Sequence, residues 1–402
     1  MNVAVIGAGI TGLTAAYYLA RAGHRVTVYD SQPHPAMRCS YANGGQISVS
    51  NSEVWNSWSN IGKGIKWMFK ADAPLLLRPS LDWRQWSWLA RFVYHTAAGH
   101  GKFNTAQTIK MGLESRELYK EMIEEEGLQF DQSDSGILHI YKNPVYFDHA
   151  IDSRSLYESN GCEWQVMPGE RMTGIDFNLK DINGVVGLAW TPSDWTGDIH
   201  KFCMALSKVL RDKYNVRQHY GSSYDMESIA VMGGYDKIVV SAGVGSVRFA
   251  RELGDDLPIY PVKGYSITIT VPDDQVKYLP KVSLLDDEAK IVTSTLGNRL
   301  RVAGTAEFAG ENYDIRHDRI EPLLCWVHTN FPRISTHDYS SWACLRPMTP
   351  NMLPIVKRSE HDERVYYHCG HGHLGWTLSP YTAELLSRMI DDDHIYSALG
   401  AC

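Results

Sequence analysis

The sequence predicts an α/β fold with two parts: a Rossmann-type domain, and a second α+β domain built on an antiparallel sheet. Two observations lead to this prediction. Residues 3–30 show the pattern strand, glycine turn, helix, strand, which is the βαβ unit of a Rossmann-type domain. Residues 259–305 contain segments that alternate apolar and polar residues, a pattern typical of antiparallel strands with one buried face.

The first thirty residues carry the most specific motif. An apolar run leads into the string Gly7-Ala8-Gly9-Ile10-Thr11-Gly12, a helix is expected up to Gly23, and a second strand ends on Asp30. In such a motif the first glycine permits a tight turn, the second lets the backbone approach a pyrophosphate, and the third lets helix and strand pack closely. The helix N-terminus attracts phosphates, and the acid can accept a ribose hydroxyl. We therefore expect an adenine dinucleotide to contact Gly7, Gly9, Ile10, Thr11, Gly12 and Asp30.

The remaining elements follow from hydrophobic periodicity and from start and stop signals. Helices are expected at 83–95, 105–126, 198–214, 321–331 and 379–391. Further strands are expected at 136–141, 216–220 and 237–241. The Rossmann-type domain is predicted to contain residues 1–80, 155–255 and 335–402. The second domain is predicted to contain residues 81–154 and 256–334.

Composition excludes several classes of protein. The net charge of −7 comes without a basic block, so nucleic acid is not an expected partner. No apolar run approaches the roughly 18 residues of a membrane span, and the first strand begins at once without a basic leader. The seven cysteines are scattered without CxxC pairs, which favours reduced thiols over a disulfide framework or a zinc site. A cytoplasmic protein is expected.

A polar loop with two adjacent glycines follows the acid of the dinucleotide motif. It runs from Arg38 to Ser48 and contains Ser40-Tyr-Ala-Asn-Gly-Gly-Gln46. This loop resembles the flavin-contacting loop of the D-amino-acid oxidase superfamily, most closely that of bacterial D-amino-acid dehydrogenases. The resemblance recurs in order at 65–69, 196–198, 260–265, 345–350 and 370–377. It implies FAD as the cofactor and a glutathione-reductase-like form of the Rossmann-type domain.

The same resemblance implies further cofactor contacts. In the first half of the chain they are Ser40, Asn43, Gly44, Gly45 and Gln46, followed by Ala242 and Gly243 after the strand at 237–241. In the last loop they are Gly370, Gly372, His373, Leu374, Gly375, Trp376 and Thr377. The amides of this loop would meet the flavin edge where negative charge builds on reduction. No metal site is expected, because His371 and His373 lack further ligands nearby in the sequence.

The implied reaction is oxidative deamination of a D-amino acid to a 2-oxo acid and ammonia, with a hydride passing from Cα to flavin N5. Arg346 is the candidate clamp for the substrate carboxylate, because a guanidinium binds a carboxylate through two parallel hydrogen bonds. An ordinary structural salt bridge is the alternative. Tyr265 is a candidate to add its hydroxyl to the same carboxylate, and a tyrosine packed in the sheet is the alternative.

Several choices stay open at this point. The same fold would suit an enzyme that acts on glycine or sarcosine, or one that acts on D-proline or its hydroxy derivative. The electron acceptor is expected to be a quinone or oxygen. Cys344 falls where sarcosine-oxidase-like relatives carry a flavin-linking cysteine, although a free buried thiol is the expectation. Six tryptophans lie between residues 55 and 88 among basic residues. We expect them to pack over the flavin site and the domain junction, and peripheral contact with the inner face of the membrane is the alternative.

Overall fold

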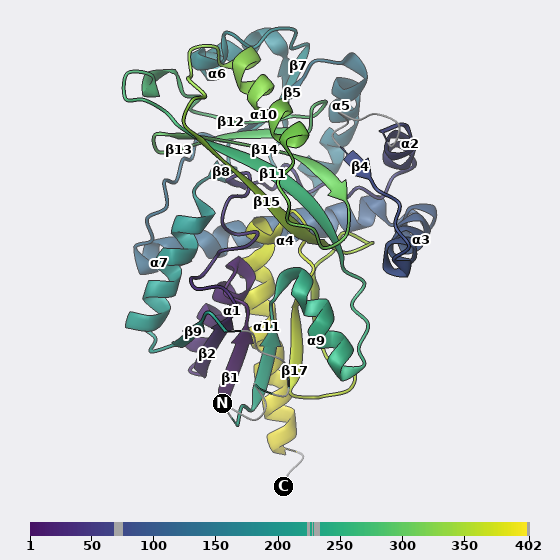
Figure 1. Ribbon diagram of the computed structural model, residues 1–402, viewed down its shortest axis with the longest axis vertical. Coiled ribbons are helices and arrows are strands. Elements are labelled where there is room, and N and C mark those ends of the chain that lie inside the picture. Colours follow the sequence, from purple (N-terminus) through teal and green to yellow (C-terminus); the bar gives the residue numbers. More distant parts are fainter. Residues whose placement is uncertain (68–74, 223–225, 227, 229–233, 400–402) are drawn as a thin grey trace.

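The computed structural model describes residues 1–67, 75–222, 226, 228 and 234–399 of the chain (Figure 1). The motif at 65–69 is therefore described only in part, and Cys402 lies outside the described residues. Within these residues the strands form a six-stranded sheet, a nine-stranded sheet and a two-stranded ribbon. The six-stranded sheet lies in the lower half of Figure 1, towards the chain ends, and the nine-stranded sheet lies in the upper half.

The six-stranded sheet is the Rossmann-type sheet that the sequence predicts. Its strands, in spatial order, are β16 (Ile355–Arg358), β17 (Val365–Cys369), β10 (Lys237–Val240), β1 (Asn2–Ile6), β2 (Arg25–Asp30) and β9 (Arg217–Tyr220). Neighbouring strands are parallel except for β16, which pairs antiparallel with β17. The predicted strands at 216–220 and 237–241 are confirmed.

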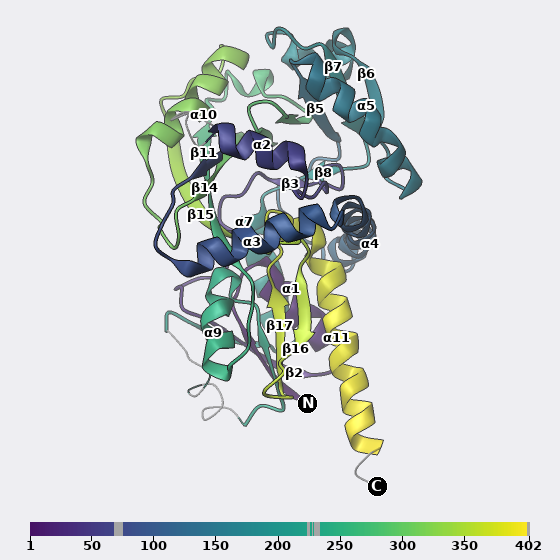
Figure 2. The ribbon, with the colours of Figure 1, turned by 90° about the vertical axis from the view of Figure 1, so that its right-hand side faces the viewer.

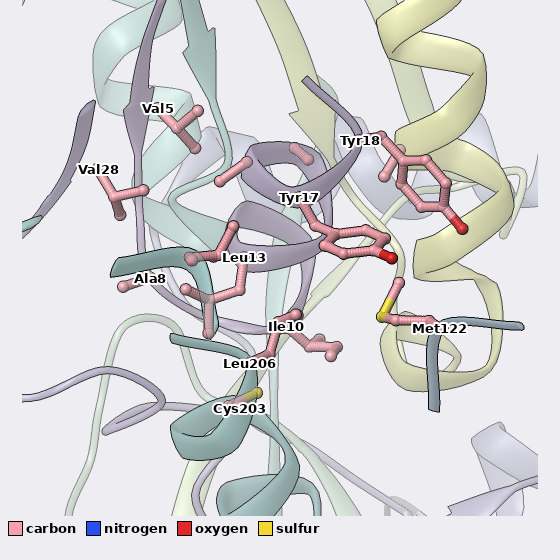
Figure 3. Close-up of a cluster of buried hydrophobic side chains, with 14 of the residues drawn as sticks. Val5, Ala8, Ile10, Leu13, Tyr17, Tyr18, Val28, Met122, Cys203 and Leu206 are labelled. Carbon is pink, nitrogen blue, oxygen red and sulfur yellow. The ribbon is translucent and has the colours of Figure 1, made fainter. Parts of the chain in front are cut away.

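Helices cover both faces of this sheet. One face carries α1 (Ile10–Arg21), α7 (Ile199–Asp212) and α11 (Gly375–Leu399), and the other carries α9 (Ser246–Leu253). Figure 3 shows the core on the first face, where Leu13 and Tyr17 of α1 pack between Val5 and Val28 of the sheet and Leu206 of α7. All five side chains are fully buried. This packing holds the N-terminus of α1 at the end of β1.

The nine-stranded sheet is largely antiparallel. Its main path is β15 (Tyr339–Met348), β11 (Tyr260–Thr270), β14 (Arg299–Phe308), β13 (Ile291–Leu296), β12 (Ser283–Asp286), β5 (Ile137–Tyr141), β7 (Gly187–Thr191) and β6 (Gln165–Pro168), and β4 (Leu75–Leu77) pairs with β14. The pairs β12–β5 and β14–β4 are parallel. Helix α10 (His317–Asn330) packs on one face of the sheet through Ile320, Leu323 and Val327. The antiparallel sheet expected from residues 259–305 is confirmed.

The remaining described helices are α2 (Trp58–Trp67), α3 (Trp83–Ala97), α4 (Gly101–Glu126), α5 (Pro144–Ser159) and α6 (Met172–Ile175). Helix α4 packs along α11 and adds Tyr119 and Met122 to the core of the six-stranded sheet. The 3₁₀ turns are η1 (Gly169–Arg171), η2 (Phe177–Leu179), η3 (Gly243–Gly245) and η4 (Val276–Tyr278), and the ribbon pairs β3 (Gln46–Ile47) with β8 (Trp195–Thr196). Figures 1 and 2 place α2 and α3 on the same side of the molecule. In the described part of the chain, no helix has the length and apolar character needed to cross a membrane.

Four strands belong to a different sheet from the one that the sequence suggested. The residues of β4, β6, β7 and β15 lie in segments predicted for the Rossmann-type domain, yet these strands extend the nine-stranded sheet. Strand β15 pairs with β11 from Tyr260 opposite Met348 to Ile269 opposite Tyr339. Such pairing joins residues far apart in the chain, and periodicity within one segment does not reveal it. The division into domains at residues 80, 154, 255 and 334 remains a prediction.

Asp198 ties the two halves of the molecule together. Its Oδ1 atom accepts hydrogen bonds from the backbone N–H groups of His200 and Lys201, so it caps α7, as the sequence suggested. Its Oδ2 atom lies 2.8 Å from Nη2 of Arg299 on β14. The same guanidinium lies 2.8 Å from Asp131. A helix of the six-stranded sheet is thereby linked to a strand of the nine-stranded sheet.

Replacing Asp198 with Ala should therefore destabilise the fold. The change removes a helix cap, which contributes roughly 1 kcal/mol, and one partner of Arg299, so the free energy of unfolding should fall by about 1–3 kcal/mol. Urea unfolding followed by circular dichroism measures this loss. Asp212→Ala, an exposed change at the other end of α7, is the matched control. Equal stability of the two variants would contradict the role of Asp198.

Candidate functional site

Four parallel strands end at one edge of the six-stranded sheet, and each is followed by residues that the sequence picked for cofactor binding. Gly7 follows β1, Asp30 ends β2, Ala242 lies two residues after β10, and Gly370 follows β17. Helix α1 leads from β1 to β2, whereas β10 lies on the other side of β1. Such a reversal of strand order opens a crevice outside the carboxyl ends of the strands, where dinucleotides bind.

The glycine loop is packed too tightly for side chains. Gly7 has a φ of +108°, and a Cβ atom there would lie 2.4 Å from the carbonyl oxygen of Ser241. A Cβ atom on Gly12 would lie 1.8 Å from the oxygen of Gly7. The N-cap residue of α1 is Gly9, so no side chain caps this helix terminus. An uncapped helix terminus on a side-chain-free turn fits the pyrophosphate of a dinucleotide.

Asp30 and Ser40 hold this loop in place. Asp30 Oδ2 accepts a hydrogen bond from the backbone N–H of Ala8 at 2.7 Å, and its Oδ1 accepts one from Gln32 at 2.8 Å. Ser40 Oγ accepts from the N–H of Ile10 at 3.0 Å. Each carboxylate oxygen of Asp30 has a second lone pair that a ribose hydroxyl can use. The predicted ribose contact therefore remains a prediction that the geometry allows.

The loop after Ser40 is anchored on the nine-stranded sheet. Its carbonyl groups at residues 42–44 accept hydrogen bonds from Ser266 Oγ at 2.7 Å, Arg301 Nη1 at 2.8 Å and Ser294 Oγ at 2.7 Å, respectively. Gln46 Nε2 donates to Ser283 Oγ at 2.8 Å, and Asn43 Oδ1 accepts from the N–H of residue 45 at 2.9 Å. The predicted flavin-contacting loop thus bridges the two sheets.

The last predicted loop lies against β15. Gly370 and Gly372 both have positive φ angles, and the N–H of Gly372 donates to the carbonyl of Pro347 at 3.0 Å. Helix α11 begins at Gly375, four residues earlier than predicted, so residues 375–377 form its first turn. Their amides belong to the positive end of a helix dipole. Thr377 also accepts a hydrogen bond from the N–H of Ser48, at 3.2 Å.

The histidines of this region are neutral at neutral pH; His368 and His371 are buried, and His373 is half-buried. His368 and His371 both hydrogen-bond the hydroxyl of Thr382, at 2.8 and 2.9 Å. Burial lowers the pKa of His368 to about 3 and that of His371 well below its usual value. Burial, and then the charge of Arg346, lower the pKa of His373 to about 4. The described residues contain no group of three or more His, Cys, Asp or Glu that could hold a metal ion.

Arg346 lies beside this loop on the face of β15 that carries Cys344. It pairs with Val262 of β11, and its guanidinium crosses the neighbouring Gly264, where a Cβ atom would lie 2.3 Å from Nη2. Its Nη1 donates to the carbonyl oxygen of Thr305 at 3.0 Å. Within the described residues no carboxylate forms a salt bridge with this half-buried guanidinium. The sequence alternative, a structural salt bridge, thus finds no partner among the described residues.

Tyr265 lies on the opposite face of the sheet. It pairs with Ala343, and both residues belong to the core under α10. Its hydroxyl donates to Glu307 at 2.6 Å. Glu307 lines a cavity of about 370 Å³ together with Arg78, Lys263, Asn312 and Arg316, among others. Alternate residues of a strand point to opposite faces, so the structure does not bring Tyr265 and Arg346 together, and Tyr265 is left out of the clamp.

Thr305 was missed by sequence reasoning, whereas Trp55 was expected near the flavin site and Gly264 belongs to a motif already noted. Thr305 has a φ of +63°, which is rare for a β-branched residue, and its carbonyl orients Arg346. Trp55 stacks on His373 with ring centroids 5.3 Å apart. Gly264 gives the guanidinium its space. The motif at 260–265 was noted in the sequence, but a role in substrate binding was given to Tyr265 and none to Gly264. Nothing in the sequence marks Thr305.

Comparisons with known proteins identify the family and the fold of the chain. A family model described as DAO, FAD dependent oxidoreductase, matches residues 2–389. D-amino acid dehydrogenase 3 of Mesorhizobium japonicum is 43% identical over 98% of this chain and 97% of that protein. D-amino acid dehydrogenase of Dechloromonas aromatica is 37% identical over 97% of both. The crystal structure of glycine oxidase from Bacillus cereus has a similar fold, with a TM-score of 0.73 at 17% identity over 98% of this chain and 95% of that chain. The predicted fold class and the predicted cofactor, FAD, are confirmed.

Gly264→Ala should weaken the binding of a small carboxylate without affecting FAD content. The new β-carbon would displace the guanidinium of Arg346, and a hydrogen bond to a charged group contributes roughly 1.5–3 kcal/mol. We expect the dissociation constant of benzoate, measured from the flavin absorption spectrum, to rise about tenfold or more. Gly174→Ala is the control, because nothing lies within 4 Å of its added atom. Unchanged benzoate binding by the Gly264 variant would refute this account of the clamp.

Proposed function

The chain belongs to the DAO family of FAD-dependent oxidoreductases, and on this premise we propose that it oxidises a D-amino acid to an imine, which water hydrolyses to a 2-oxo acid and ammonia. Bound FAD supplies the acceptor for the hydride that leaves Cα. The relatives at 43% and 37% identity are named D-amino acid dehydrogenases, which supports this choice of substrate. The glycine loop, Asp30, the loop at 40–46, residues 242–243 and the loop at 370–377 would hold FAD.

The single observation that carries the proposal is the unpaired guanidinium of Arg346. It is half-buried, its Nη1 is oriented by Thr305, and no carboxylate of the described residues neutralises it. A partly buried cation without a counter-charge is costly. A substrate carboxylate would supply this counter-charge through two parallel hydrogen bonds. The proposed role of Arg346 is therefore to fix the substrate by its carboxylate.

Other residues near Arg346 shape the space for the rest of the substrate. His373 and Trp55 form a stacked pair beside it. Tyr313, whose ring is covered by the guanidinium of Arg38 at 4.6 Å, lies near Cys344. Lys263 is buried and holds the loop of Tyr313 through hydrogen bonds to Asn312 at 2.9 Å and to the carbonyl of Asp314 at 3.1 Å. Aromatic rings would therefore line the side-chain pocket.

Replacing Arg346 tests the proposed clamp. In Arg346→Ala the carboxylate would face no partner, and truncating one side of a buried charged pair costs roughly 2–5 kcal/mol. The efficiency of anaerobic flavin reduction by a D-amino acid should fall by about 30-fold to several thousand-fold, with FAD content unchanged. Arg346→Lys keeps the charge but loses the forked geometry, so we expect a smaller fall.

The same anaerobic assay separates the substrate classes. A panel of D-amino acids, L-amino acids, glycine, sarcosine, D-proline and hydroxyproline shows which compounds bleach the flavin. Bleaching by D-amino acids supports the proposal, and bleaching by glycine or sarcosine alone would replace it with the oxidase alternative. An Arg346→Ala enzyme of near-normal efficiency would disprove the clamp.

We further propose that a membrane quinone is the electron acceptor and that the side of the molecule with α2 and α3 docks on the membrane (Figure 2). Trp58, Trp83 and Trp86 are 61%, 68% and 50% exposed. Tyr94 and Phe103 are each 64% exposed in α3 and at the start of α4. The expectation that the tryptophans pack inward holds for Trp88, which is 4% exposed, but not for these three. Exposed tryptophans favour the interfacial region of a bilayer.

The exposed tryptophans can be tested with vesicles of phosphatidylethanolamine and phosphatidylglycerol. Trp83→Ser with Trp86→Ser should lower vesicle binding about tenfold or more, since burying one such side chain contributes roughly 1.5–3 kcal/mol. Reduction of a quinone embedded in the vesicles should fall equally, whereas reduction of a soluble dye should not change. Phe177→Ser, which alters a ring in η2 that is 67% exposed, is the control. Unchanged vesicle binding, or rapid reoxidation by oxygen, would count against this proposal.

A further inference from the structure

The thiols of Cys39 and Cys344 lie against each other beside Arg346. Cys39 belongs to the loop after β2, and Cys344 lies on β15, opposite Gly264. The Sγ atom of Cys39 donates to the carbonyl oxygen of Leu345 at 2.8 Å, next to Cys344 in the chain, and the two thiols are close enough to perturb each other's pKa. Both residues are partly exposed. A small reagent can therefore reach a pair of cysteines that no other part of the mechanism uses.

The two thiols differ in acidity. The neighbouring Cys39 thiol, and then the charge of Arg346, lower the pKa of Cys344 despite burial. The neighbouring Cys344 thiol, and then burial, raise the pKa of Cys39. A low-pKa cysteine beside a second, resolving cysteine is the arrangement in which oxidation ends in a disulfide. Cys344 is thus the attacking thiol and Cys39 the resolving one.

We propose that Cys39 and Cys344 form a reversible disulfide when the enzyme meets hydrogen peroxide. The thiolate of Cys344 attacks one peroxide oxygen, the O–O bond breaks, and the hydroxide that leaves takes up a proton to become water. The sulfur of Cys39 then attacks the sulfenic sulfur, the S–S bond forms, and the S–O bond breaks as a second water leaves. The two thiols lose two electrons and two protons, and the peroxide is reduced to two waters. A dithiol reverses the change.

The disulfide would also disturb the substrate clamp, an effect that rests on the proposed role of Arg346. An S–S bond is about 2 Å long, which is much shorter than the separation of two sulfurs that are not bonded to each other. Its formation draws the loop of Cys39 towards β15 and removes the S–H donor from the carbonyl of Leu345, the residue before Arg346. Small displacements of a positioning group are costly, so we expect KM for the amino acid to rise by roughly tenfold.

The experiment uses the FAD-loaded enzyme treated with hydrogen peroxide. Free thiols are then blocked with N-ethylmaleimide, and peptides are analysed by mass spectrometry without reduction. We expect a linked peptide joining Cys39 and Cys344, and its loss after dithiothreitol together with recovery of KM. Cys39→Ser and Cys344→Ser should abolish the linked peptide and the rise in KM. Cys325→Ser, at an exposed cysteine outside the pair, should retain both.

Two results would overturn the disulfide. One is a sulfinic or sulfonic acid at Cys344 with no linked peptide, and the other is flavin that stays with the protein in acid because Cys344 is bonded to it. A linked peptide with unchanged KM would overturn the effect on the clamp alone. The Arg346→Ala enzyme separates the two proposals. Its linked peptide should still form under peroxide, whether or not Arg346 binds the substrate.

Discussion

The pairing of β15 with β11 determines which side chains face the cofactor crevice. Val262 lies opposite Arg346, and Gly264 lies opposite Cys344. Arg346, Gly264 and Cys344 therefore lie on one face of the sheet. Tyr265 and Ala343 lie on the other, in the core under α10. A shift of one residue would exchange the two faces and would bury Arg346 in that core. The register is secured by the apolar residues of both strands, so packing on the α10 side maintains the chemistry on the crevice side.

The loop at 40–46 turns two separate sheets into one site. Through Ser40 it contacts the N-terminus of α1 in the six-stranded sheet. Through its carbonyl groups it receives hydrogen bonds from Ser266, Ser294 and Arg301 in the nine-stranded sheet. Asp198 and Arg299 make a second link near the same junction. The residues proposed to hold FAD and the proposed clamp, Arg346, are therefore held at a fixed separation, which transfer of a hydride between two bound molecules would require.

Local signals made much of the fold predictable. The glycine motif, the cap at Asp198 and the end of α4 at Gly127, which has a φ of +61°, depend on residues adjacent in the chain. The sheet to which β15 belongs, and the face that Tyr265 occupies, depend on pairing with distant strands. Strand β11 is buried on both faces over most of its length, so alternation could not show which residues face the crevice.

The candidate site was likewise predictable only in part. The residues proposed to hold FAD could be selected because each group follows a recognisable strand, and Arg346 was selected through a resemblance. The lack of a counter-charge for Arg346 among the described residues, and the contacts of Thr305 and Cys39 with this segment, depend on which distant residues fold against it. Helix α5 was missed, although Asn143 and Pro144 form a start signal, because its apolar face is narrow, with Ala150 and Tyr157 as its buried residues.

The charge of Arg346 has a consequence for the amine as well as for the carboxylate. On the proposed function the substrate arrives as a zwitterion, and its nitrogen must lose a proton before its lone pair can form the C=N bond. His373 is neutral at neutral pH because its pKa is lowered to about 4, so it adds no positive charge next to the substrate amine. A guanidinium close to an ammonium group disfavours the charged amine, since like charges lower its pKa. In the proposed role, Arg346 would bind the carboxylate and also promote the neutral amine, so that step would need no protein base.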